Sequence, residues 1–367
     1  MPPVDPAELI RPNIMRIKPY RPGKPIEEVE RELGVTDIVK LASNENPLGP
    51  SPLAVEAMEK AIRETRLYPD NDCFYLTRDL AAHLGVPPEQ VVVGRGSDEI
   101  LHNIGLAFIR PGDEVIVPDH VFTVYECTGE LMDGALVTVP LKNYTYDLEA
   151  MAARCSERTK VVFIANPNNP TGTSVGGAAV ERFLAALPGH TIAVFDEAYY
   201  EYVDDPDFPR SLGYLGGDKH VIVLRTFSKI YALAGLRVGY GITTPEIAAL
   251  LQRVREPFNV TNVAQAAARA SLRDPGQVER SRQVNAEGKA YLYREFERLG
   301  LPYAPSQTNF VLVDVKRDCV GVFRGLLKRG VIVRSGDVFD YPTHLRVTIG
   351  TPQENERLIA ALEQCLA

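Results

Sequence analysis

The 367-residue sequence lacks tryptophan, a paired cysteine motif, a histidine cluster and a long apolar run. Its five cysteines are odd in number and include no CxxC pair, which favours reduced thiols over a disulfide framework. The six histidines do not take the HExxH spacing of a catalytic zinc site, so metal catalysis is disfavoured. No segment approaches the roughly 18 consecutive apolar residues of a membrane span. The first residues contain no basic segment followed by an apolar one, so we expect no secretory signal and a cytoplasmic location.

The charge balance is mildly acidic, with 40 Lys and Arg against 48 Asp and Glu and a net charge of −8. A chain of this sign, without a long run of either charge, is not expected to bind nucleic acid or an anionic membrane as its main role. A local basic pocket is still compatible with it. The length accommodates one large domain and a smaller one.

Short apolar segments alternate with amphipathic ones, which predicts an α/β fold with a largely parallel sheet. Most of these segments are rich in β-branched residues and almost free of polar ones, as expected for strands buried on both faces. Seven of them predict one large sheet: Val91–Val93, Glu114–Val117, Leu136–Val139, Val161–Ala165, Thr191–Phe195, Val221–Leu224 and Val238–Gly241.

The pattern changes beyond about residue 275, where a long amphipathic helix is predicted over Arg280–Leu299. Three further strands and a C-terminal helix follow, which indicates a smaller α+β domain over 276–367. Residues 45–275 then form the large domain. Residues 1–44, which are rich in proline, are predicted to be an extended arm that crosses between the two and contributes to the small domain.

Four polar motifs each follow a predicted strand, at the sheet edge where open α/β folds bind ligands. Gly94–Glu99 fits either a simple helix N-cap or an anion site at a helix N-terminus, and Glu99 breaks the GxGxxG dinucleotide pattern. Asn166–Gly172 is a turn-rich loop in which two prolines restrain the backbone around Asn169.

The other two motifs carry charge. Asp196–Tyr199 offers a carboxylate for Mg²⁺ or for a heteroaromatic nitrogen, and the GxxxxGK[ST] loop that the Mg²⁺ interpretation needs is missing. Thr226–Lys229 places a lysine between hydroxyl residues and an apolar run, and Arg237 follows eight residues later. Burial there would favour a nucleophilic amine.

Together the four motifs meet the needs of pyridoxal phosphate. The aldehyde of this cofactor requires a lysine, and its pyridine nitrogen requires a carboxylate. Its ring oxygen requires Asn and Tyr donors, and its phosphate requires a helix N-terminus, hydroxyls and an arginine. The conjunction is more specific than any single motif.

The motifs Asn169–Gly172, Asp196–Tyr199, Ser228–Lys229 and Arg237 resemble the signature of fold-type I aminotransferases. Leu41–Pro50, Arg225–Lys229 and Leu345–Thr351 are similar to histidinol-phosphate aminotransferases in particular. The resemblance extends from about residue 14 to the C-terminus. It implies a large domain with a mostly parallel seven-stranded sheet, a smaller α+β domain, pyridoxal phosphate as cofactor, and a homodimer.

The resemblance also implies roles for individual residues. Lys229 would form the Schiff base with the cofactor and then move protons during transamination. Asp196 would pair with the pyridine nitrogen, and Phe122 would stack on the ring. The remaining implied contacts are Asn169 and Tyr199 to the ring oxygen; Ser97, Asp98, Thr226, Ser228 and Arg237 to the phosphate; Tyr68 to the phosphate of the neighbouring subunit's cofactor; and Tyr20, Asn44, Arg334 and Arg346 to substrate.

The sequence departs from the family pattern in two places. The ring-stacking position, commonly Tyr, is Phe122 here, which can stack but has no hydroxyl. The segment Ser335–Tyr341 carries additional acidic residues that would alter the substrate pocket.

The predicted reaction is ping-pong amino transfer between histidinol phosphate and 2-oxoglutarate, giving imidazole acetol phosphate and glutamate. An aminotransferase for the aromatic amino acids Phe and Tyr on the same fold is the alternative, because one planar ring replaces another at little cost. A decarboxylase or lyase is more distant. A transcriptional regulator would need a DNA-binding module, and about 40 Pro-rich residues before Leu41 are too few for one.

Overall fold

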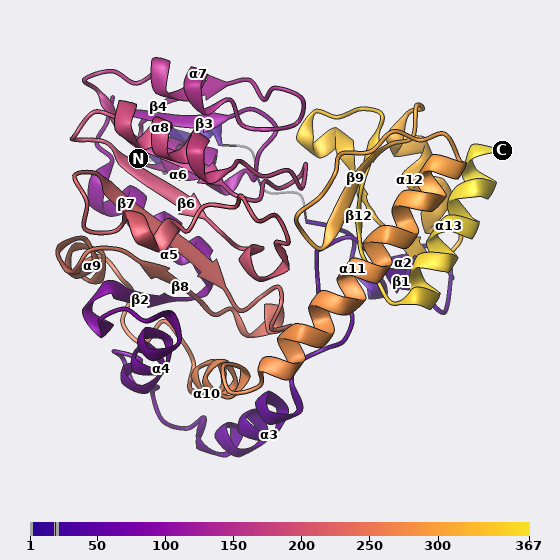
Figure 1. The fold of residues 1–367 in the computed structure, drawn as a ribbon, viewed down its shortest axis with the longest axis horizontal. Helices are drawn as coiled ribbons and strands as arrows, with labels where there is room; N and C mark the ends of the chain where they lie inside the picture. Colours follow the sequence, from indigo (N-terminus) through magenta and orange to yellow (C-terminus); the bar gives the residue numbers. More distant parts are fainter. Residues whose placement is uncertain (1–2, 18, 20–21) are drawn as a thin grey trace.

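A seven-stranded sheet forms the centre of the larger of two lobes in the computed structural model, which describes residues 3–17, 19 and 22–367 (Figure 1). Its strand order is β2-β8-β7-β6-β5-β3-β4, and only β8 runs antiparallel to its neighbours. The strands are β2 (Val91–Gly94), β3 (Glu114–Pro118), β4 (Ala135–Val139), β5 (Thr159–Ala165), β6 (Ile192–Asp196), β7 (His220–Thr226) and β8 (Gly239–Ile242). The predicted α/β class and all seven predicted strands are confirmed.

The central strands are buried along nearly their whole length, which explains why their sequences are apolar rather than alternating. Helices that pack against the sheet and against one another supply the cover. The helices of this lobe are α3 (Pro52–Ala61), α4 (Phe74–Leu84), α5 (Gly96–Phe108), α6 (Val124–Leu131), α7 (Leu148–Ala153), α8 (Gly177–Ala186), α9 (Pro245–Gln252) and α10 (Asn262–Ser271).

The smaller lobe has its own apolar core, separate from that of the large sheet. Its antiparallel sheet has the order β11-β12-β9, and β1 pairs in parallel with β10. The elements are β1 (Val39–Lys40), β9 (Phe310–Asp314), β10 (Val331–Ile332), β11 (Arg334–Ser335), β12 (His344–Thr348), α12 (Cys319–Leu327) and α13 (Pro352–Leu366). The predicted strand over 331–333 is divided here, because Val333 separates two strands that pair in different sheets.

Helix α11 (Pro275–Arg298) runs from the foot of the large lobe to the small one (Figure 1). Its far half carries Leu292 and Phe296, which belong to the core of the small lobe. Asp274 caps its N-terminus by accepting a hydrogen bond from the backbone of Gln277 at 3.1 Å. The helix therefore begins five residues earlier than the sequence pattern predicted.

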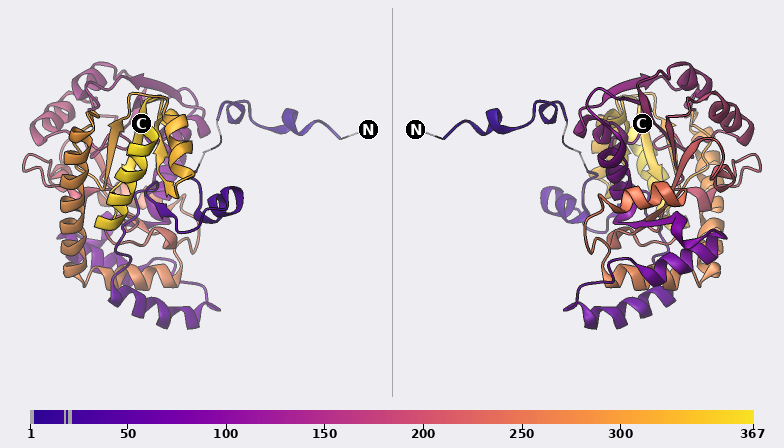
Figure 2. Two further views of the ribbon diagram at one scale, coloured as in Figure 1. Left: turned by 90° about the vertical axis from the view of Figure 1, so that its right-hand side faces the viewer. Right: turned by 90° about the vertical axis from the view of Figure 1, so that its left-hand side faces the viewer.

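The N-terminal segment is less extended than its prolines suggested. After α1 (Pro6–Leu9), which has no buried residue and projects from the molecule (Figure 2), Asn13 donates hydrogen bonds to the carbonyls of Glu130 and Leu131 at the end of α6. Helix α2 (Ile26–Leu33) then packs on the small lobe through Val29. A helix forms there because Pro25 lies at its N-cap rather than inside it, and Gly34 ends it in the left-handed conformation.

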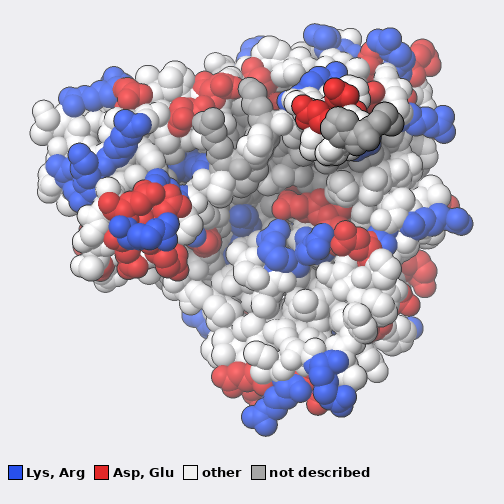
Figure 3. Space-filling view, turned by 180° about the vertical axis from the view of Figure 1, so that it is seen from behind, with Lys and Arg blue, Asp and Glu red and all other residues white. Residues whose placement is uncertain are grey.

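Charged side chains of both signs are interspersed over the rear face, and the surface is hollowed between the lobes (Figure 3). None of the described helices is long and apolar enough to cross a membrane.

Candidate active site

A cavity of about 120 Å³ lies at the carboxyl ends of the central strands, where open α/β sheets place their ligands. The four polar motifs of the sequence meet there, because parallel strands bring the segments that follow them to one edge. The cavity is lined by Ser97, Asp98, Phe122, Tyr125, Ala165, Pro167, Asn169, Asp196, Ala198, Tyr199, Thr226, Ser228, Lys229 and Arg237.

One end of the cavity is built to receive an anion. Helix α5 begins there at Gly96, and its first backbone N–H groups and partial positive charge favour a negative group. The hydroxyls of Thr226 and Ser228 lie 3.0 Å apart, and the Arg237 guanidinium is 3.4 Å from Ser228 Oγ. A cluster of hydroxyls, an arginine and a helix N-terminus is the chemistry that recognises phosphate. We call the residues Gly96, Ser97, Thr226, Ser228 and Arg237 the phosphate cup.

Two glycines make the phosphate cup sterically possible. Gly96 has a φ of +72°, and a Cβ on it would lie 2.8 Å from Arg237 Nη2. A Cβ on Gly239 in β8 would lie 2.5 Å from the backbone nitrogen of Ser97. Asp98, which is half exposed, contacts Arg237 Nη2 at 3.2 Å and so holds the guanidinium against the cup.

The other end of the cavity holds a buried carboxylate. Asp196 is 6% exposed; Tyr125 Oη donates to its Oδ2 at 2.7 Å, and the Ala198 N–H donates to its Oδ1 at 3.1 Å. Burial, opposed in part by these hydrogen bonds, raises the pKa of Asp196 from 3.8 to about 6. A carboxylate held at this depth is suited to pair with a cationic ring nitrogen, since a nearby positive charge offsets the cost of its burial.

Lys229 also lines the cavity. Its Nζ is 3.5 Å from the backbone oxygen of Ser43 and 5.6 Å from the centre of the Tyr199 ring. The Tyr199 hydroxyl accepts a hydrogen bond from Asn44 Nδ2 at 2.8 Å. Phe227 and Ile230, on either side of the lysine, are completely buried, so the lysine backbone is held firmly while its amine reaches the cavity.

The two predicted substrate arginines are neighbours in the small lobe. Arg334 and Arg346 face each other across β11 and β12 and are 9% and 6% exposed. Arg346 Nη1 donates to Asn169 Oδ1 at 2.5 Å, and its Nη2 donates to the Ala42 carbonyl at 2.7 Å. The Asn169 amide oxygen is thus bonded to Arg346, a contact that the sequence did not indicate.

Phe339 supports both arginines and joins the lobes. Its ring centre is 5.8 Å from Cζ of Arg334 and 5.3 Å from Cζ of Arg346, within the range of cation–π attraction. Its carbonyl accepts a hydrogen bond of 2.7 Å from Nδ1 of His120, which follows β3 in the large lobe. The atypical segment 335–341 is therefore a contact between the lobes.

Ten of the predicted site residues line the cavity, whereas Asn44, Tyr68, Arg334 and Arg346 of the described residues do not. Tyr68 is 83% exposed on the surface of the large lobe and does not line the cavity. Tyr20 lies outside the described residues. Arg334 lies on β11 of the small lobe, beside Arg346 on β12. Sequence reasoning assigned no role to Tyr125 or Phe339; Tyr125 lies three residues after Phe122, a helical spacing that could have indicated it.

The donor set fits pyridoxal phosphate. The phosphate cup would hold the phosphate, Asp196 would hold the ring nitrogen, and Lys229, which lines the same cavity, would supply the amine that an aldehyde requires.

Comparison with known proteins agrees with this fit. The family model for aminotransferases of class I and II matches residues 36–362. A histidinol-phosphate aminotransferase of Moorella thermoacetica is 55% identical over 366 residues, which cover 100% of this chain and 95% of that protein. One of Caldicellulosiruptor saccharolyticus is 48% identical, covering 98% and 100%. The crystal structure of histidinol-phosphate aminotransferase from Sinorhizobium meliloti in complex with pyridoxal 5′-phosphate superposes with a TM-score of 0.89 at 30% identity, covering 97% of each chain.

Substituting Gly239→Ala should weaken the phosphate cup. The added Cβ would meet backbone atoms of Gly96 and Ser97, so the start of α5 must move. We expect the dissociation constant of pyridoxal phosphate to rise at least tenfold and stability to fall by about 1–3 kcal/mol. Gly241→Ala in the same strand is the matched control, because its Cβ would meet only side chains, at 3.2 Å or more. Equal dissociation constants of pyridoxal phosphate for Gly239→Ala and Gly241→Ala would contradict the proposed steric role of Gly239.

The raised pKa of Asp196 predicts a pH-dependent stability in protein without added cofactor. A group whose folded pKa is raised contributes stability below its unfolded pKa and loses it as pH rises through the folded pKa. The free energy of unfolding should therefore fall, relative to Asp196→Asn, between about pH 4 and pH 6. A shift from 3.8 to about 6 corresponds to about 3 kcal/mol.

Urea unfolding of both proteins across this range measures the difference. Glu197 and Glu201, whose pKa values burial also raises, titrate in both proteins and cancel in the comparison. A constant difference between the two proteins from pH 4 to pH 7 would show that Asp196 does not have a raised pKa.

Proposed function

The chain belongs to the class I and II aminotransferase family, and we propose that it is a pyridoxal-phosphate-dependent enzyme that transfers an amino group from histidinol phosphate to 2-oxoglutarate. The observation that carries the proposal is the convergence of Lys229, Asp196 and the phosphate cup on one cavity. The names of the relatives, 55% and 48% identical over nearly the whole chain, support the choice of substrate.

Bound pyridoxal phosphate supplies an electron sink that stabilises negative charge at the substrate carbon. The chain supplies placement and proton transfer. Asp196 would keep the ring nitrogen positively charged, Tyr125 orients that carboxylate, and Phe122 and Tyr199 would border the ring. Lys229 is the general acid–base, because it is the only lysine among the described residues that line the cavity.

In this proposal, residues of the small lobe bind the substrate. Histidinol phosphate carries a phosphate and 2-oxoglutarate carries carboxylates, so the two substrates of a ping-pong reaction can use the same cationic groups in turn. Arg334 and Arg346 are held beside each other for this purpose, with Phe339 behind them. An aminotransferase for aromatic amino acids is the second candidate, since a guanidinium also binds a carboxylate.

The functional unit in this proposal is a cytoplasmic homodimer. Tyr68 does not line the cavity of its own chain; its ring stacks on the exposed Phe258, and Leu67, Phe74 and Tyr75 nearby in the sequence are exposed as well. Such a patch is typical of a protein interface. We place Tyr68 at the cofactor phosphate of the neighbouring subunit, with residues 1–44 as the arm, 45–275 as the cofactor domain and 276–367 as the small domain.

Replacing Lys229 by alanine should abolish amino transfer, with kcat reduced at least 10⁴-fold, because the group that moves the proton is lost. Turnover of histidinol phosphate with 2-oxoglutarate measures this effect. Lys219→Ala, a lysine outside the cavity, is the control and should retain activity. Transamination by Lys229→Ala at the wild-type rate would refute the assignment.

The same assay separates the two substrates. We expect kcat/KM for histidinol phosphate to exceed that for phenylalanine or tyrosine by at least 100-fold. A preference for the aromatic amino acids would favour the second candidate and leave the aminotransferase assignment intact.

A further inference from the structure

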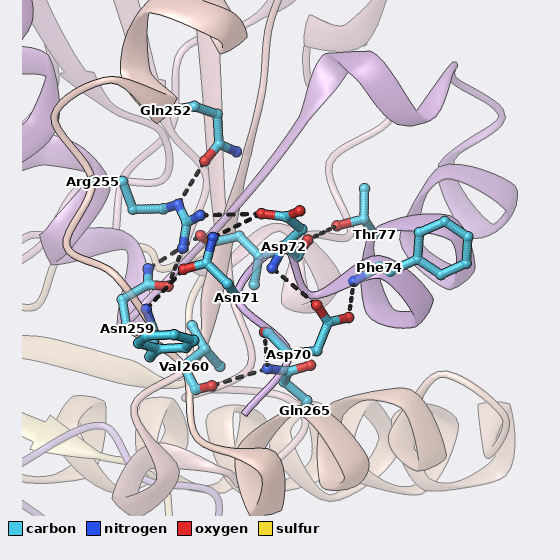
Figure 4. Close-up of polar contacts among 12 residues, drawn as sticks. Asp70, Asn71, Asp72, Phe74, Thr77, Gln252, Arg255, Asn259, Val260 and Gln265 are labelled. Atoms are coloured by element: carbon cyan, nitrogen blue, oxygen red, sulfur yellow. Dashed lines mark hydrogen bonds and ion pairs between the residues drawn. The ribbon is translucent and has the colours of Figure 1, made fainter. Parts of the chain in front are cut away.

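The connection between α9 and α10 contacts both the surface loop that carries Tyr68 and the start of α5. We call residues 67–73 the Tyr68 loop and residues 252–260 the bracket. Figure 4 shows Arg255 of the bracket extending toward Asp72 of the loop, with which it forms an ion pair. The bracket lies outside the cavity, and the reaction proposed above assigns it no role.

On its outer side the bracket supports the Tyr68 loop. The Phe258 ring stacks on Tyr68 with ring centres 4.7 Å apart, and the Phe258 N–H donates to Asn71 Oδ1 at 3.0 Å. Gln265, at the start of α10, donates from Nε2 to the carbonyls of Asp70 and Val260, each at 3.0 Å. The position of Tyr68 thus depends on the backbone of the bracket.

On its inner side the bracket holds the start of α5. Asn259 Nδ2 donates to Glu99 Oε2 at 2.7 Å. The same carboxylate oxygen accepts the backbone N–H of Arg95 at 2.5 Å, one residue before Gly96 of the phosphate cup. Glu99 is only 7% exposed, so its carboxylate is costly to leave without these donors. These two hydrogen bonds account for an acidic residue at position 99, where the GxGxxG dinucleotide-binding pattern would have a glycine.

Arg255 contacts both the Tyr68 loop and Asn259, which holds the start of α5. Its side chain is 8% exposed; Nη1 donates to Asn259 Oδ1 at 2.7 Å, Nε donates to Gln252 Oε1 at 2.6 Å, and Nη2 lies 3.6 Å from Asp72 Oδ1 in the loop. A planar guanidinium can satisfy several acceptors in fixed directions, which a flexible ammonium cannot do. A continuous path of polar contacts therefore runs from Asp72 through Arg255, Asn259 and Glu99 to Arg95 (Figure 4 shows its outer part).

We propose that Arg255 and Asn259 are positioning residues that hold the Tyr68 loop and the phosphate cup in one fixed relative arrangement. The inference rests on the proposed function only in that the ligand of the cup is a phosphate. If Tyr68 completes the cup of a second copy of the chain, the same contacts make the placement of Tyr68 depend on the order of the cup in its own chain. Disorder in the phosphate cup would then increase disorder in the Tyr68 loop, and the reverse.

The test compares Arg255→Gln and Asn259→Ala with Arg253→Gln, an exposed arginine two residues away that serves as the matched control. In purified protein, amide hydrogen exchange should accelerate about tenfold in both residues 67–73 and residues 95–99, the loss expected for one hydrogen bond to a charged group. The control should exchange at the wild-type rate. Arg255→Lys keeps the charge but loses the planar geometry, and it should give an intermediate rate.

A second measurement separates positioning of the cup from general loosening. The dissociation constant of pyridoxal phosphate should rise about tenfold in Arg255→Gln and Asn259→Ala, whereas that of pyridoxal, which lacks the phosphate, should change less than twofold. Faster exchange in only one of the two segments, or an equal loss of affinity for both ligands, would overturn the inference. If the wild-type protein binds no pyridoxal phosphate, the proposed function fails, and the exchange data alone then decide for or against the coupling.

Discussion

The burial of the Asp196 carboxylate is the constraint on which the site depends. A charge at the end of a fully buried strand is unfavourable unless donors and cations surround it. Tyr125 and the Ala198 N–H supply the donors, and Lys229 supplies positive charge within the cavity. The site is therefore organised to receive a cationic ring, and the same arrangement leaves the carboxylate under-stabilised when the ring is absent.

Groups suited to bind anions lie in both lobes. The large lobe presents the phosphate cup at the start of α5, and the small lobe presents Arg334 and Arg346 on adjacent strands. Phe339 lies against both arginines, and its carbonyl accepts a hydrogen bond from His120 of the large lobe. Segment 335–341 therefore connects the two arginines of the small lobe to the large lobe.

Sequence reasoning was most successful where a residue's role follows from its place after a strand. Asp196, Thr226 and Lys229 were predicted at one sheet edge, and the structure places them there, because parallel strands leave no other position for the segments that follow them. It was less successful with contacts between segments far apart in the chain. The bond from Arg346 to Asn169 spans 177 residues, and no local pattern reports such a pairing.

The sequence by itself determined the α/β class, the seven strands, the kind of cofactor and which polar motifs follow the strands, because hydrophobic periodicity and motif position are local properties. Only the tertiary structure decided which carboxylate is buried with a tyrosine donor, where Phe339 lies against the arginines, and how Arg255 connects the Tyr68 loop to α5. Those features depend on packing between distant segments. Tryptophan, metal-ligand spacing and paired cysteines are missing from the chain, yet these packed polar contacts give the site its order without them.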